Sequence, residues 1–68
     1  MGESRMKNNV RSQRLAKGWS QATLGERCGV SRQTIISIEN CKLNPSLPLA
    51  FMLAKVLDTS VEELFLPS

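Results

Sequence analysis

The sequence predicts an all-α fold, and both the spacing of its turn-forming residues and the pattern of its apolar residues support this. Turn-forming residues at Gly18, Gly29, 44–45 and 58–59 divide the 68 residues into five short pieces. No piece alternates apolar and polar residues with the period of two expected of a half-buried strand. We therefore expect five short helices packed around one core, because a chain of this length builds only one.

The first helix is predicted from a weak apolar stripe that contains Val10 and Leu15. Residues 1–5 show no pattern, and we expect them to be a flexible N-terminal leader. The single domain is then expected to span residues 6–68.

The next two helices are predicted over residues 21–28 and 32–40, with a tight turn at Gly29 between them. Glycine suits such a reversal because it adopts positive φ without steric cost. Two short helices joined in this way form a helix-turn-helix, here over residues 21–40. Four of the five helices are preceded by a serine suited to N-capping, namely Ser20, Ser31, Ser46 and Ser60.

The last two helices follow from apolar spacing and capping. Residues 47–57 carry apolar residues at i, i+3, i+4 and i+7, which are Ala50, Leu53, Ala54 and Leu57. Ser60 and Glu63 form a capping-box pattern, with the Glu63 carboxylate expected to reach the Ser60 amide. A short helix is expected to follow this cap.

Composition excludes several classes of function. The chain has no histidine and two cysteines, so zinc-finger spacing and histidine-based acid–base catalysis are excluded. We expect no catalytic site, no metal site and no cofactor. Free thiols at Cys28 and Cys41 favour a reducing cytosol, and no apolar run is long enough to cross a membrane. We expect a cytoplasmic protein.

The charge is distributed unevenly along the chain. Residues 1–45 contain eight Lys or Arg and three Glu, a net charge of +5, whereas residues 46–68 have a net charge of −2. A basic front favours binding of a polyanion. An ordinary solvated surface would explain the total charge of +3 equally well.

The helix predicted at residues 32–40 has two unlike faces. At 100° per residue, Ile35, Ile38 and Glu39 share one arc. The other face carries Arg32, Gln33, Ile36, Ser37 and Asn40. Arginine pairs with guanine, glutamine with adenine, and an aliphatic group contacts the thymine methyl. These types therefore suit the major groove, although the exposed face of any surface helix has a similar composition.

The segments "SQATLGERCGVSRQTIISIENCKLNPSL" and "LAKVLDTSVEELF" resemble the Cro/CI-type (XRE-family) helix-turn-helix transcriptional regulators, and the match covers residues 10–65. The resemblance implies a compact five-helix Cro/phage-repressor-like DNA-binding domain. It implies a homodimer that binds a palindromic double-stranded DNA operator and regulates transcription, and we expect a repressor.

The resemblance also implies roles for individual residues. The base-reading residues would be Arg32, Gln33, Ile36 and Ser37. The phosphate-binding residues would be Gln21, Ser31, Asn40 and Lys42. Arg14 of the first helix would form a structural ion pair with Glu39 of the recognition helix. Cys41 departs from the family, because glycine usually follows that helix.

Residues 46–66 contain more apolar side chains than one core face hides easily, and such surplus surface usually marks an interface. We expect a dimer interface among Leu49, Phe51, Met52, Leu64, Phe65 and Leu66. A second protein on this apolar C-terminal face is an alternative. The chain would then be an antitoxin-like or other protein-interaction module on the same fold, with secondary DNA binding.

Overall fold

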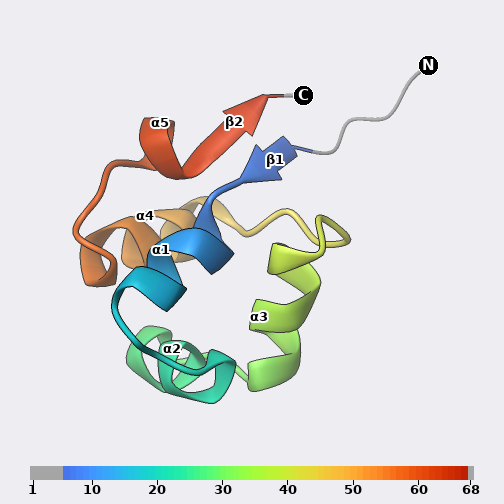
Figure 1. Ribbon diagram of the computed structural model, residues 1–68. Helices are drawn as coiled ribbons and strands as arrows, with labels where there is room; N and C mark the ends of the chain where they lie inside the picture. The colour runs from blue at the N-terminus through green and yellow to red at the C-terminus, as the bar shows by residue number, and fades with distance from the viewer. Residues whose placement is uncertain (1–5, 68) are drawn as a thin grey trace.

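The computed structural model describes residues 6–67 and contains the five predicted helices together with a pair of short strands (Figure 1). In chain order the elements are β1 (Met6–Asn8), α1 (Val10–Ala16), α2 (Gln21–Cys28), α3 (Arg32–Glu39), α4 (Leu47–Val56), α5 (Val61–Leu64) and β2 (Phe65–Pro67). The predicted leader at residues 1–5 lies outside the described residues.

The predicted serine caps are confirmed at the start of α2, α3, α4 and α5. Each serine hydroxyl accepts a hydrogen bond from the backbone N–H three residues later, at distances of 3.0–3.3 Å. The second half of the predicted capping box is wrong. The Glu63 carboxylate accepts a hydrogen bond from the Thr59 hydroxyl at 3.0 Å instead of from the Ser60 amide.

One apolar core joins all five helices. Its fully buried large side chains are Val10, Leu24, Ile35, Ile38, Leu53, Leu57 and Leu64. Ala50 and Ala54 complete the predicted inner face of α4. Leu15 remains 55% exposed, so it adds little to the expected stripe of α1.

The turn between α2 and α3 depends on two glycines. Gly29 has φ 73°, the left-handed conformation expected at this reversal. Gly25 lies inside α2, where an added Cβ would come within 2.8 Å of the Val30 carbonyl oxygen. The missing side chain at Gly25 therefore lets the turn pack directly on α2.

The strand pair is not predicted by the sequence. β1 and β2 pair in antiparallel register, with Met6 opposite Pro67 and Asn8 opposite Phe65. The Asn9 amide continues the pairing by donating to the Leu64 carbonyl at 2.8 Å. Figure 1 shows the two strands side by side at one end of the molecule, where they join the beginning of the described chain to its end.

Candidate nucleic-acid interface

The exposed face of α3 carries the predicted base-reading side chains. Arg32 and Gln33 in the first turn are exposed, whereas Ile36 and Ser37 are half-buried. On the opposite face Ile35 and Ile38 are completely buried. The amphipathic division predicted for this helix is therefore present, with Ile36 less exposed than a position fully open to solvent.

Ser31 caps this helix. Its hydroxyl accepts a hydrogen bond from the Thr34 amide at 3.1 Å and lies 2.9 Å from the Thr34 hydroxyl. This local use of the hydroxyl fixes the first turn of α3, in which Arg32 and Gln33 stand.

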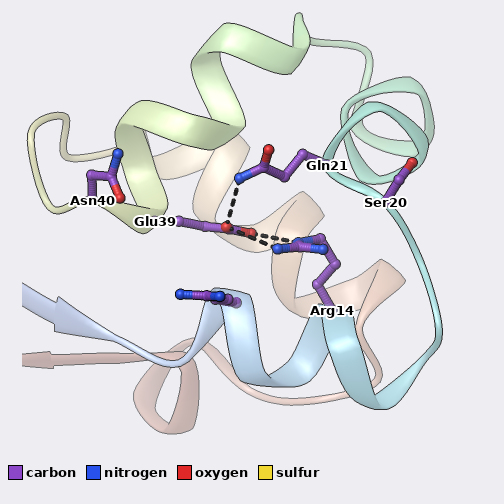
Figure 2. Close-up of a pocket in the computed structure, with 6 residues that line it drawn as sticks. Arg14, Ser20, Gln21, Glu39 and Asn40 are labelled. Carbon is purple, nitrogen blue, oxygen red and sulfur yellow. Dashed lines mark hydrogen bonds and ion pairs between the residues drawn. The ribbon is translucent and has the colours of Figure 1, made fainter.

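Arg14 and Glu39 form the expected ion pair (Figure 2). The Arg14 Nε and Nη2 atoms donate to the two Glu39 carboxylate oxygens at 2.7 and 3.1 Å. Their side chains expose 8% and 2% of their surface. Arg14 Nη1 also donates to the Trp19 carbonyl at 2.8 Å. The pair therefore ties α1 to α3 and keeps the carboxylate off the exposed face of α3.

Gln21 joins this network from the first residue of α2. Its Nε2 atom donates to Glu39 Oε1 at 3.1 Å, as Figure 2 shows. An amide nitrogen carries two hydrogens, so one remains for another acceptor. The first backbone N–H groups of a helix also lack partners within the helix. The N-terminus of α2 therefore presents donors suited to an anion.

A shallow polar hollow of about 390 Å³ lies where α1, α2 and α3 meet. It is lined by Arg11, Arg14, Ser20, Gln21, Glu39 and Asn40. It contains two predicted phosphate-binding residues, Gln21 and Asn40. Arg11 was not predicted, although it lies one helical turn before Arg14 and adds a second cation.

The remaining predicted phosphate residue lies just after α3. Asn40 is the C-cap, and Lys42 is exposed two residues later. Between them Cys41, which stands where glycine is usual in the family, has φ 60°, in the left-handed region. The Lys42 amide donates to the Ser37 carbonyl at 2.9 Å, and the Cys41 amide to the Ile38 carbonyl at 3.0 Å. These two bonds form the Schellman motif.

The cysteines do not form a metal site with neighbouring residues. Within residues 6–67 there is no group of three or more His, Cys, Asp or Glu placed to hold a metal ion. Burial raises the pKa of the Cys28 thiol above its ordinary value, which keeps it neutral near pH 7. In the same part of the chain, no helix has the length and apolarity needed to cross a membrane.

The predicted dimer residues fall into two groups. Phe51 and Met52 on α4 are 58% and 40% exposed, and Leu49 is half-buried. Leu64 and Phe65 are 0% and 7% exposed, so the expectation that they are surplus to the core is wrong. Both belong to the same core cluster as Ala50 and Leu53 of α4. The Leu66 side chain lies outside the described part of the chain.

Leu47 was missed as a surface apolar residue. It is 65% exposed and lies one turn before Phe51 on α4, a spacing of i, i+4 that the sequence already contained. Beside it is an apolar hollow of about 340 Å³. The hollow is lined by Asn44, Pro45, Leu47, Ala50, Val61 and Phe65.

Comparisons with known proteins agree with this geometry. The family model described as helix-turn-helix matches residues 10–64. An uncharacterized HTH-type transcriptional regulator of Methanocaldococcus jannaschii is 44% identical over 61 residues, which cover 90% of this chain and 92% of that protein.

Two solved structures share the fold. The restriction-modification controller protein C.AhdI from Aeromonas hydrophila is 38% identical with a TM-score of 0.78, covering 84% of this chain and 86% of that one. The N-terminal DNA binding domain of SinR from Bacillus subtilis is 35% identical with a TM-score of 0.72, and 78% of each chain is covered. The chain therefore belongs to the Cro/CI-type helix-turn-helix family and carries the DNA-binding domain of a transcriptional regulator.

Proposed function

We propose that this regulator binds a palindromic double-stranded DNA operator as a homodimer and represses transcription. The observation that carries the proposal is the contrast between the two sides of α3, one exposed to solvent and the other carrying the buried Glu39 carboxylate. Arg32 and Gln33 are exposed on one side, while the Glu39 side chain is 2% exposed and paired with Arg14 on the other. A helix built in this way offers hydrogen-bonding groups to DNA without presenting a charge that repels phosphate.

Base reading is assigned to the face that contains Arg32 and Gln33. A guanidinium group matches the two acceptors of guanine in the major groove, and a glutamine amide matches adenine. Ile36 and Ser37 are half-buried beside them. Ile36 offers methyl groups suited to contact with a thymine methyl.

Phosphate binding is assigned to the residues around this face. Gln21 and Asn40 line the polar hollow, and Arg11 lies there too. Lys42 is exposed beyond the end of α3. Ser31 adds the capped N-terminus of α3, through which backbone amides reach a phosphate. Such contacts fix the register of the protein on the duplex and carry no sequence information themselves.

The homodimer is proposed from the exposed apolar side chains of α4. Leu47, Phe51 and Met52 are 65%, 58% and 40% exposed, and apolar groups of this size favour burial in an interface. Two identical subunits would place their α3 helices in successive major grooves, about 34 Å apart. A second protein on α4, as in an antitoxin, is the competing occupant and would not impose two-fold symmetry on the DNA.

Repression is proposed because it needs nothing beyond the DNA-binding face. A small domain seated on a promoter blocks polymerase by occupying the same duplex, whereas activation needs an additional contact surface for polymerase.

The division between reading and positioning is tested by comparing Arg32→Ala with Lys42→Ala. We expect Arg32→Ala to lose about 1–3 kcal/mol of discrimination at one base pair. We expect Lys42→Ala to weaken binding to all sequences alike and to reduce the slope of log K against log salt by about 0.9 per subunit, hence about 1.8 for the dimer. Affinities for an operator and its single-base variants, measured at several salt concentrations, separate the two effects. Equal loss on every sequence for both variants would refute the assignment.

A further inference from the structure

The Asn8 side chain connects three separate parts of the molecule. Asn8 ends β1 and is half-buried. Its Oδ1 atom accepts a hydrogen bond from the Val10 amide at 3.1 Å, at the start of α1. Its Nδ2 atom donates to the Ile38 carbonyl at 2.9 Å, in the last turn of α3, and lies 3.7 Å from Cys41 Sγ. One amide group therefore bridges the strand pair, α1 and the end of α3.

The Ile38 carbonyl is the point where this bridge meets the Schellman motif. The same oxygen accepts the Cys41 amide at 3.0 Å, so both of its lone pairs are used. Cys41 is held at φ 60°, which is unfavourable for a residue with a Cβ. A turn with this built-in cost depends on neighbouring contacts to stay formed.

The other end of the bridge is fixed independently of α3. The backbone of Asn8 pairs with Phe65 of β2. The adjacent Asn9 donates through its side-chain Nδ2 atom to the Glu63 carbonyl at 2.9 Å. Its backbone N–H donates to the Leu64 carbonyl at 2.8 Å. Asn8 is thus held by the C-terminal segment while its side chain reaches across to α3.

We propose that Asn8 is a positioning residue for DNA binding, an inference that rests on the proposed phosphate contacts of Asn40 and Lys42. These two residues flank Cys41, the residue whose turn Asn8 restrains. By holding the Ile38 carbonyl, Asn8 keeps the chain after α3 in the conformation that presents both side chains. Asn8 itself contacts no DNA in this account.

The variant that isolates this role is Asn8→Ser. A serine hydroxyl still accepts the Val10 amide, as short polar side chains do at helix starts. It lacks the Nδ2 donor and is too short to reach Ile38. The matched control is Asn9→Ser, which removes an amide-to-carbonyl bond of the same 2.9 Å length that does not involve α3.

The first readout is amide hydrogen exchange of the free protein, followed by NMR. In Asn8→Ser we expect the amides of Cys41, Lys42 and Leu43 to exchange about fivefold faster than in Asn9→Ser, the factor that corresponds to one lost hydrogen bond. Amides in the middle of α2 should be unchanged between the two variants. Equal exchange of residues 41–43 in both variants overturns the bridge.

The second readout is DNA affinity, measured on an operator duplex enriched from a random pool. We expect Asn8→Ser to bind about fivefold more weakly per subunit than Asn9→Ser and to show the smaller salt slope of Lys42→Ala. If Lys42→Ala lowers the slope while Asn8→Ser matches Asn9→Ser, the positioning role alone is overturned. If Lys42→Ala leaves the slope of the wild type unchanged, the proposed phosphate contact fails and the inference fails with it.

Discussion

Two ion pairs within residues 6–67 differ in burial and therefore in how much they stabilise the fold. Arg14 and Glu39 expose 8% and 2% of their side chains, whereas Lys17 and Asp58 expose 30% and 78%. Removing one partner of a buried pair leaves a charge without compensation, while an exposed charge is simply rehydrated. The difference makes the exposed pair a control for the buried one.

We expect Arg14→Ala to cost about 3–5 kcal/mol of folding free energy, because the Glu39 carboxylate would stay buried without its cation. A domain of this length has about 3–10 kcal/mol in total. The variant should therefore be unfolded or nearly so. Lys17→Ala should cost at most about 1 kcal/mol. Circular dichroism shows whether Arg14→Ala is folded, and urea denaturation gives the stability of each variant that is. If both variants fold and have equal midpoints, the buried pair contributes no more than the exposed one.

The role of a residue could be predicted from the sequence where it depends only on the position of the residue on its own helix. Glu39 lies on the inner flank of its helix, so its absence from the exposed face of α3 followed from the helical wheel. Arg11 could not be singled out, because an exposed arginine one turn from Arg14 has no pattern of its own. Leu64 and Phe65 were misassigned because the surplus of apolar residues in 46–66 was judged without the strand pair. Phe65 begins β2, which pairs with β1, and both side chains are buried in the core.

At the scale of the element, the end of α3 carries a cost that substitution should relieve. Cys41 has φ 60°, which costs a residue with a Cβ about 1–2 kcal/mol. Glycine would remove this cost but lose about 0.5–1 kcal/mol through the greater freedom of the unfolded chain.

We therefore expect Cys41→Gly to stabilise the domain by about 0.5–1 kcal/mol, the difference between these two effects. Cys41→Ala is the matched control, since it removes the thiol but keeps the Cβ, and it should give no gain. Thermal unfolding of the three proteins decides the matter. A gain of similar size in Cys41→Ala would mean that the thiol and not the backbone was unfavourable.

The helices could be predicted because their capping signals lie close together in the sequence. The strands could not be predicted, because their pairing joins residues that are far apart. Ser20, Ser31, Ser46 and Ser60 each lie within one turn of the amide that they cap, so a short window contains the whole signal. The strands contain three residues each and pair across nearly the full length of the chain. Three residues are too few for a periodicity, and the pairing is decided by where α1 and α5 place the chain ends.

In the molecule as a whole, the basic residues and the exposed apolar side chains are concentrated on different helices. The segment 1–45, with net charge +5, contains α1, α2 and α3, which surround the polar hollow. The segment 46–68, with net charge −2, contains α4 and α5, and Leu47, Phe51 and Met52 of α4 are exposed. We therefore propose that the first three helices bind DNA and that the fourth binds a second copy of the chain.

Selection of bound duplexes from a random DNA pool at near-physiological salt is the sharpest test of a dimeric DNA reader. The wild type should enrich a two-fold symmetric motif whose half-sites lie about one helical turn apart. Phe51→Asp places a charge in the proposed interface and should enrich at most a single half-site, with weaker binding. Enrichment of one asymmetric motif by both proteins, or of no motif by the wild type, would contradict a dimeric reader of an operator.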